Sequence, residues 1–213
     1  GIKDSEKIFS VTSGDMDGSG KRQMNFSRPL ADIIIECSPN IEYGGALSFT
    51  TGYNRYWIEE DGVRKNVDIV GVSKFNGNAL KVFGFEAVEG SLDDIIDYNT
   101  LAVSETIAKR FGLEVGMTLG YEEQKDIITI KAIFKDMPKN SHLRDISALR
   151  NMGDESVNNF SKWSYNYFVK LHVPSQINEM SENLSKTTGE YLKMKYFSAL
   201  PSAEEMGMSQ ESY

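Results

Sequence analysis

The chain of 213 residues has one cysteine, two histidines, five prolines and no apolar run long enough to cross a bilayer. One cysteine excludes an internal disulfide and any metal site built from several cysteines. A membrane-spanning helix needs about 20 apolar residues. The longest apolar segments, such as IITIKAIF at 127–134, have instead the length of a strand or helix in a protein core.

Basic residues are also fewer than acidic ones. The chain has 23 lysines and arginines against 31 aspartates and glutamates, which gives a net charge of −8. Nucleic-acid binding depends on clustered basic side chains that neutralise phosphates. Anionic membrane surfaces likewise attract basic segments. The charge balance therefore argues against both kinds of partner.

The motifs of the common enzyme classes are missing. The sequence contains no G-x-S-x-G, H-E-x-x-H, P-loop or strand-linked G-x-G-x-x-G. Carboxylates are numerous, so a hydrolase with a carboxylate pair is not excluded by counting, but nothing marks out any pair. The loop GDMDGSGK at 14–21 resembles half of a calcium loop, yet Phe26 stands where a bidentate Glu is required. We predict that the chain is not an enzyme and that it has no catalytic, cofactor-binding or metal site.

Hydrophobic periodicity predicts an α+β protein with mixed sheets. The Asp61-Gly62 pair between alternating segments is typical of a hairpin. Ser104 is placed to cap a helix that ends at Gly112, and Ser175 to cap the last helix. The strands are expected at 7–13, 43–74, 101–103, 127–134 and 161–173, and the helices at 29–37, 105–111 and 175–192.

Two features on these elements allow more than one interpretation. Tyr53, Tyr56 and Trp57 could form a platform for a sugar, but cross-strand pairing in a sheet is the more common role of such residues. Cys37 falls on the apolar face of the first predicted helix, where it is expected to act as a small buried hydrophobe.

The segment IFKDMPKNSHLRD at 133–145 concentrates polar residues and one of the two histidines. Phe134 ends a strand, and Pro138 keeps the preceding residue extended. Asn140 or Ser141 is expected to cap a helix that begins near His142 and buries Leu143, Ile146 and Leu149. These roles account for each residue without chemistry, so we predict a connection here and not a catalytic centre.

The same segment, as AIFKDMPKNSHL, resembles a signature of the extracytoplasmic domain of MacB-like, FtsX-related ABC transporter permeases of the Bacteroidetes type. LAVSETIAKRFG resembles the family's Ser-Glu-x-x-Ala-Lys-x-x-Phe-Gly block. Further similar segments, from EKIFSV to WSYNYFVKL and FSALPSAEEMGMS, follow in the family's order, although Ala132 stands where glycine is usual. The residues that match the two motifs are Ser104, Glu105, Phe111, Gly112, Lys135, Asp136, Pro138, Asn140, Ser141 and His142.

The resemblance implies a two-lobed α+β MacB-like periplasmic core with mixed sheets. Residues 1–90 with 161–213 would form a porter-like lobe, and residues 91–160 an inserted lobe. The chain would be the loop between two membrane helices at the periplasmic face of the inner membrane, and would bind no cofactor. Its implied partners are those helices, a separate or fused cytoplasmic ATPase, a periplasmic adaptor or lipoprotein, and a second copy in the full transporter.

The implied function is transmission of ATP-driven helix movement to a substrate or envelope partner, in efflux, lipoprotein release or signalling. A stand-alone extracytoplasmic ligand-binding or sensor module is the alternative. It predicts a closed pocket and chain ends that need not meet.

Overall fold

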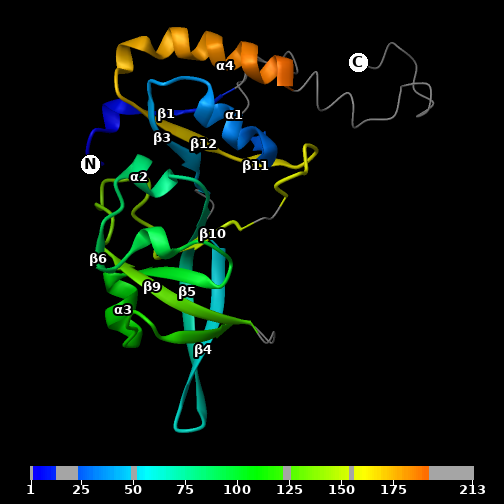
Figure 1. Cartoon of the computed structure of the whole chain (residues 1–213). Helices are drawn as coiled ribbons and strands as arrows, with labels where there is room; N and C mark the ends of the chain where they lie inside the picture. The colour runs from blue at the N-terminus through cyan, green and yellow to red at the C-terminus, as the bar shows by residue number, and fades with distance from the viewer. Residues whose placement is uncertain (1, 13–23, 49–51, 122–125, 154–155, 192–213) are drawn as a thin grey trace, which may run out of the picture.

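The computed structural model describes residues 2–12, 24–48, 52–121, 126–153 and 156–191. The molecule is elongated, and the helix α4 and a long hairpin of β4 and β5 lie at its opposite ends (Figure 1). The acidic loop 14–21 lies outside the described residues, so the expectation that it is not a calcium site stays a prediction.

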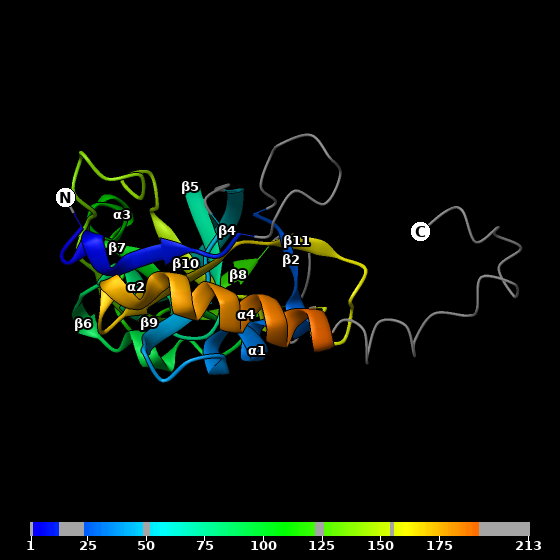
Figure 2. The ribbon, with the colours of Figure 1, turned by 90° about the horizontal axis from the view of Figure 1, so that it is seen from above.

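The end that carries α4 contains a three-stranded antiparallel sheet with the order β1-β12-β3. Its central strand comes from the late part of the chain and one edge strand from the early part, so segments far apart in the sequence pair in this sheet. The helices α1 and α4 pack against each other over it (Figure 2). We call this part the first lobe; its elements are η1 (Ser5–Lys7), β1 (Ile8–Ser10), β2 (Phe26–Ser27), η2 (Arg28–Leu30), α1 (Ala31–Glu36), β3 (Ile41–Ala46), β11 (Trp163–Tyr165), β12 (Tyr167–Leu171), η4 (Pro174–Gln176) and α4 (Ile177–Tyr191).

The other end is a seven-stranded mixed sheet with the order β6-β9-β7-β10-β5-β4-β8. Because β8 also pairs with β9, six of these strands close into a ring, and β6 extends beyond it on β9. We call this sheet with α3 the second lobe; its elements are β4 (Gly52–Glu60), β5 (Val63–Phe75), β6 (Ala87–Gly90), η3 (Leu92–Asp94), β7 (Thr100–Ser104), α3 (Glu105–Phe111), β8 (Thr118–Tyr121), β9 (Ile127–Phe134) and β10 (Ala148–Asn151).

The expected division of the chain at residues 91 and 160 stays a prediction. Sheet membership gives a reason to change its bounds, because β4, β5 and β6 precede residue 91 and still pair within the seven-stranded sheet. We propose that the inserted lobe comprises residues 52–151, with the short helix α2 (Ala79–Phe83) belonging to the contact between the lobes.

A continuous apolar core joins the two lobes around α2. The ring of Phe83 contacts that of Phe168 in the first lobe, with 5.1 Å between centroids. The ring of Phe85 contacts that of Phe134 in the second lobe at 5.6 Å. We call the whole group the junction cluster; its buried members are Leu47, Phe75, Ala79, Leu80, Val82, Phe83, Phe85, Ile95, Ala102, Ala132, Phe134, Leu143, Ile146, Leu149 and Phe168.

The long strand β5 and several hydrogen bonds also connect the two lobes at this junction. Strand β5 runs for 13 residues from the hairpin to Phe75, which forms a bridge with Leu47. Immediately after it, the Asn76 side chain accepts a hydrogen bond from the Ala46 amide at 2.7 Å. The amide of Asn78 donates to the Gly44 carbonyl at 3.0 Å. The outer edge of β3 is therefore bonded to the segment that leaves the second lobe.

Most elements expected from periodicity are present. The α+β class with mixed sheets is confirmed, and so are the hairpin at Asp61-Gly62 and the helix that Ser104 caps. In β9, Ile128, Ile130 and Ala132 are fully buried, as the alternation requires. In the strand expected at 161–173, the alternate residues Tyr165, Tyr167, Val169 and Leu171 are all buried. That strand is divided at Asn166 into β11 and β12.

Two helix predictions are wrong in detail. Residues 141–145 form turns and lead into β10, so the helix expected to begin near His142 is not there. The i, i+3 spacing of Leu143, Ile146 and Leu149 does bury all three, but strand pairing with β5 and β7 offers more hydrogen bonds than an isolated turn of helix. Ser175 lies inside η4 and not at its cap, which is Val173.

Within the parts of the chain that the structure describes, we find no helix with the length and apolar character of a membrane span.

Candidate functional site

The two sequence motifs meet at one edge of the second lobe. Strands β7 and β9 are parallel neighbours, and Ser104 is paired in register with Phe134 at their carboxyl ends. The motif around Ser104 therefore continues into α3 beside the place where the motif around Asp136 leaves β9. Parallel pairing of this kind brings together residues that are 30 positions apart in sequence.

Asp136 connects the two motifs directly. The hydroxyl Oγ1 of Thr106 donates to Asp136 Oδ2 at 2.6 Å, and the amide of Thr106 donates to Oδ1 at 3.5 Å. In the same turn the Ser104 hydroxyl accepts from the Ile107 amide at 3.4 Å. A carboxylate and a hydroxyl oxygen thus satisfy two of the amide groups that the first turn of a helix leaves without partners.

The other residues of the motifs have mainly structural surroundings. Ser141 is buried, and its hydroxyl accepts from the Leu143 amide at 3.0 Å, which stabilises the turn before β10. Gly112 ends α3 with a φ of 63°, and its amide donates to the Ala108 carbonyl. Phe111 is half-buried under the guanidinium of Arg110, 5.0 Å from the ring centre. The remaining motif residues are exposed: Glu105, Lys135, Asp136, Pro138, Asn140 and His142.

We expect Asp136 and Thr106 to be energetically coupled. Asp136→Ala and Thr106→Val should each lower the free energy of unfolding, and the double variant should lose less than the sum. A coupling of about 1 kcal/mol is reasonable for one exposed hydrogen bond to a charged group. Urea denaturation of the four proteins measures it. Strictly additive losses would mean that the 2.6 Å contact does not hold the two motifs together.

The loop after β9 also borders a small pocket of about 150 Å³. Lys135, Asp136, Met137 and Pro138 form one wall, and Phe83 and Glu86 form another. The opening is completed by the first described residues of the chain, Ile2 and Lys3. The motif region therefore lies where the second lobe, the junction cluster and the N-terminal segment meet.

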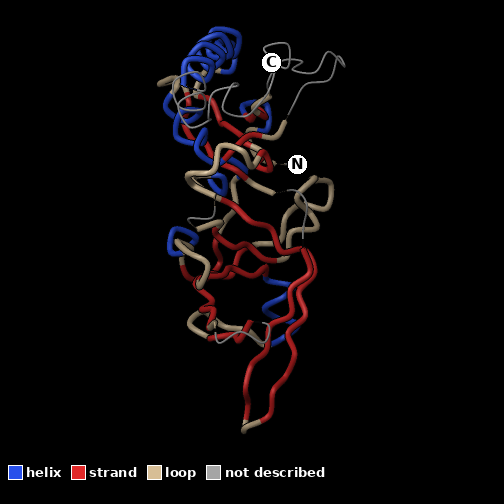
Figure 3. Tube along the Cα trace, turned by 90° about the vertical axis from the view of Figure 1, so that its right-hand side faces the viewer, coloured by secondary structure: helices blue, strands red, loops and turns tan. Residues whose placement is uncertain are grey.

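The hairpin of β4 and β5 is the second candidate surface, and it projects from the end of the molecule opposite to α4 (Figure 3). Strand β4 pairs with β8 only through Tyr56 and Trp57. Beyond them, residues 58–65 pair only with one another among the described strands. The turn at Asp61 and Gly62, with φ of 52° and 75°, is of the kind that fits the twist of a two-stranded ribbon.

The aromatic residues of the hairpin face different surroundings and do not form one platform. Tyr56 is fully buried, and its ring lies 5.2 Å from that of Tyr121 on β8, so the predicted cross-strand pairing is confirmed for this residue. Burial raises the pKa of Tyr56 above its ordinary value. The Trp57 ring lies under the guanidinium of Arg64 at 4.1 Å, while Tyr53 is exposed.

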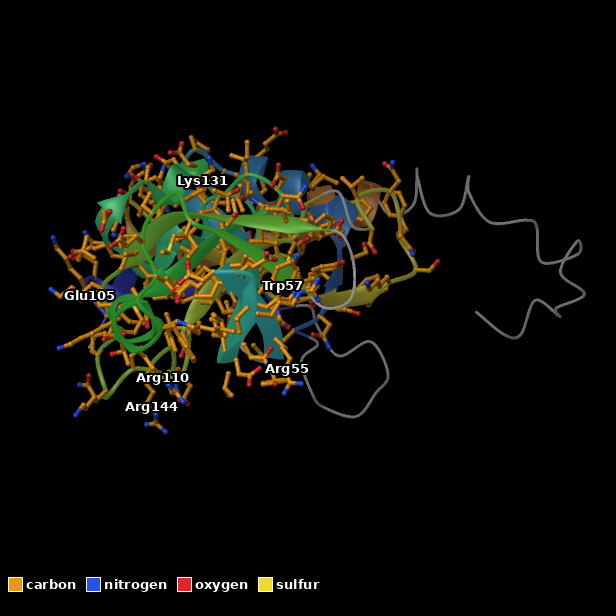
Figure 4. All side chains as sticks on the ribbon, turned by 90° about the horizontal axis from the view of Figure 1, so that it is seen from below. Arg55, Trp57, Glu105, Arg110, Lys131 and Arg144 are labelled. Atoms are coloured by element: carbon orange, nitrogen blue, oxygen red, sulfur yellow. The ribbon has the colours of Figure 1, made fainter. Side chains whose placement is uncertain are left out.

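The hairpin carries exposed ion pairs, and Figure 4 labels one of their members, Arg55. Arg55 Nε donates to Asp68 Oδ1 at 2.8 Å, and the Tyr53 hydroxyl donates to the same oxygen at 2.8 Å. Lys65 and Glu60 form a further pair nearer the tip. The hydrogen bond from Arg55, followed by that from Tyr53, lowers the pKa of Asp68 below its ordinary value of 3.8.

The stability of the hairpin should therefore fall in acid. Because the folded pKa of Asp68 is depressed, its contribution is present above the ordinary value of 3.8 and disappears as the pH falls through the lower folded value. Trp57 fluorescence in a Trp163→Phe background should report the change. In the matched Asp68→Asn protein this acid transition should be absent; an identical transition in both proteins would assign it to other groups.

Two further hollows occur among the described residues. One, of about 560 Å³, lies between α2 and η3, where Lys81 and Asp93 form an ion pair at 3.1 Å. The other, of about 390 Å³, lies under α4 beside Asn40 and His172. Both polar ends of the Asn40 amide are already bonded to the main chain of Val173. No group of His, Cys, Asp and Glu side chains that could hold a metal occurs in the described ranges.

Solved structures with the same fold give this geometry a context. A domain of a permease-type protein from Porphyromonas gingivalis superimposes with a TM-score of 0.66 over 88% of this chain and 84% of its own, at 23% identity. The extracellular domain of YknZ, a noncanonical ABC-type transporter of Gram-positive bacteria, superimposes with a TM-score of 0.54 over 81% of this chain and 88% of its own, at 11% identity. No protein-family model matches the chain, and no curated protein matches its sequence.

These likenesses confirm the fold implied by the two motifs: the chain has the fold of an extracytoplasmic domain of an ABC-type permease. Sequence reasoning located the motif residues but did not predict that Asp136 bonds to Thr106 or that the hairpin outruns its neighbours. The Asp-Gly turn was the available signal for the hairpin. Nothing in the sequence indicates how far a hairpin projects, because that depends on the length of β8 beside it.

Proposed function

We propose that the chain is the extracytoplasmic domain of an ABC transporter permease. It would stand at the periplasmic face of the inner membrane, between two membrane helices of the same permease. There it would transmit ATP-driven movement of those helices to a substrate or envelope partner, without catalysis of its own. The observation that carries the proposal is the fold likeness to two transporter-associated domains over more than four fifths of the chain.

The internal construction of the molecule supports a mechanical role. The earliest and latest described elements, η1 and α4, belong to the first lobe, and the hairpin lies at the other end (Figure 1). A force applied near the chain ends would pass through the junction cluster, where packed aromatic rings connect both lobes. Close-packed interiors transmit displacement because they have little free volume to absorb it.

The hairpin is the surface that best fits a partner in the envelope. It combines exposed valines, Val63 and Val70, with exposed charges such as Arg55 and Glu60. Interfaces between proteins commonly mix an apolar centre with a polar rim. An adaptor or lipoprotein that binds here would be moved by the whole domain. The ATPase would act from the cytoplasm, and a second permease copy would complete the transporter.

The test uses the full-length gene product, purified from its native membrane with an affinity tag on the membrane-embedded part. An ABC ATPase should co-purify. A single cysteine at Val63, in a Cys37→Ala background, should change its rate of modification by a maleimide reagent when ATP with vanadate is added. A cysteine at Val157, which is exposed outside the hairpin, serves as the matched position.

Absence of an associated ATPase would overturn the proposal and favour the stand-alone sensor or ligand-binding module. An ATPase that co-purifies while both cysteines react at unchanged rates would keep the permease assignment but reject mechanical transmission. Those two failures are distinguishable, because the first concerns which proteins co-purify and the second concerns whether the domain moves when nucleotide is added.

A further inference from the structure

The segment before β1 contains a non-glycine residue, Asp4, in the left-handed backbone conformation. Asp4 has a φ of 55°, a conformation that costs a residue with a Cβ about 1 kcal/mol or more unless its surroundings hold it. The Lys7 amide donates to the Asp4 carbonyl at 2.9 Å, and η1 then leads into β1. Ile2 and Lys3, which precede this residue, line the pocket that Phe83 and the loop 135–138 also border.

Asp4 is fixed to the first lobe. Lys170, on the central strand β12, donates from Nζ to Asp4 Oδ2 at 3.2 Å. The side chain of Lys170 is only 15% exposed and that of Asp4 33% exposed, so the pair is shielded more than an ordinary surface ion pair. The same hydrogen bond is the main reason that the pKa of Asp4 is lowered.

Ile2, by contrast, reaches the second lobe. Its half-buried side chain packs against the junction cluster, as does that of Met137 in the loop after β9. Both residues line the pocket of about 150 Å³ that Phe83 closes from the junction side. The neighbouring Asp136 holds this loop to the first turn of α3 through Thr106. The N-terminal segment therefore has one attachment on each lobe, and a single residue, Lys3, separates them.

We propose that residues 2–4 form a clamp across the two lobes, and that the loop 135–138 is the seat that receives it. The segment of the sequence motif around Lys135 and Pro138 thereby acquires a role: it presents Met137 to Ile2. The part of the inference that concerns force rests on the proposed function. In a permease, a pull on the N-terminal end would reach the second lobe directly through this seat as well as through the junction cluster.

Limited trypsin digestion of the chain tests the clamp without any transporter. Trypsin can cleave after Lys3, within the clamp, and after Lys7, at the end of η1. Mass spectrometry measures the rate at which the N-terminal peptide is released. Met137→Ala, in the second lobe, and Lys170→Met, in the first, should each raise the cleavage rate about five-fold or more, since local protection follows the population of the open form. Met24→Ala, an exposed methionine in the first-lobe part of the chain, should not change it.

Cleavage within the exposed hairpin, after Arg64 or Lys65, gives an internal standard for general loosening. A faster loss of the N-terminal peptide with unchanged hairpin cleavage supports the clamp. Unchanged cleavage in Met137→Ala would overturn it, because the segment would then be held by the first lobe alone. Equal acceleration at both sites would also overturn it, since the variant would simply be less stable throughout.

The transmission step is tested separately in the full-length permease with the cysteine at Val63. Met137→Ala should abolish the nucleotide-dependent change in modification rate, while Met24→Ala should retain it. A retained change in Met137→Ala overturns the transmission role of the seat. If the parent protein shows no such change, the proposed function has failed, and the clamp is judged on the trypsin result alone.

Discussion

Gly71→Ala should lower the free energy of unfolding by about 3 kcal/mol or more, because two costs act at the same residue. Gly71 lies in β5 with a φ of 93°, a backbone conformation that residues with a Cβ rarely adopt. A Cβ there would also overlap the carbonyl oxygen of Asp145 and come within 3.1 Å of the Ser147 amide nitrogen. That amide donates to the Gly71 carbonyl at 2.8 Å, so neither chain can withdraw without losing the bond.

Gly62→Ala is the matched control for Gly71→Ala. Gly62 has a φ of 75°, but a Cβ there would have no atom within 4 Å. It should cost only the conformational part, about 1 kcal/mol, and chiefly within the hairpin. Chemical denaturation of both variants measures the difference. Equal losses would show that the close approach of β5 to residues 145–147 has room to relax.

Phe83→Ala should have an effect of similar size, a loss of about 3–5 kcal/mol, as is typical when a buried phenylalanine ring is removed. Phe83 is 5% exposed and contacts Phe168 of the first lobe from its place in α2. Because this contact is part of the junction cluster, its removal should also separate the unfolding of the two lobes. Calorimetry should show one transition for the parent chain and two for the variant.

Phe83→Leu keeps most of the apolar volume but removes the aromatic ring. It therefore tests whether the lobes are held together by the ring contacts or by the buried apolar volume alone. It should cost clearly less than Phe83→Ala and preserve a single transition. A single cooperative transition in Phe83→Ala would contradict the view that α2 couples the lobes. The long strand β5 and the bonds around Asn76 would then be sufficient by themselves.

The sequence allowed those features to be predicted that depend on neighbouring residues. The alternation in 127–134, the Asp61-Gly62 turn and the Ser104 cap are all local patterns, and each predicted element is present. The motif residues were located by resemblance, and the predicted roles of Ser104 as the cap of α3 and of Gly112 at its end are confirmed. Ser141 was expected to cap a helix and instead bonds to the Leu143 amide within a turn. Whether these residues have a further role stays a prediction.

The features that were missed depend on contacts between distant parts of the chain. Residues 141–149 carry helical spacing, but parallel pairing with β5 and antiparallel pairing with β7 make them a turn and a strand. The bond between Thr106 and Asp136 requires β7 and β9 to be neighbours, and that order is not readable from either segment. The same holds for Ile2 and Met137, which line one pocket and pack against the junction cluster only because the lobes pack around α2.

The length of β5 has a consequence for how far a small rotation is amplified. At about 3.3 Å per residue, its 13 residues make an arm of about 40 Å from the junction to the hairpin turn. If the arm stays straight, a tilt of about 10° at the junction, comparable to the rigid-body rotations of known switching proteins, moves the turn by about 7 Å. That is more than the spacing between neighbouring strands in a sheet. A displacement of this size at the turn would be enough to break one set of contacts with a partner and form another.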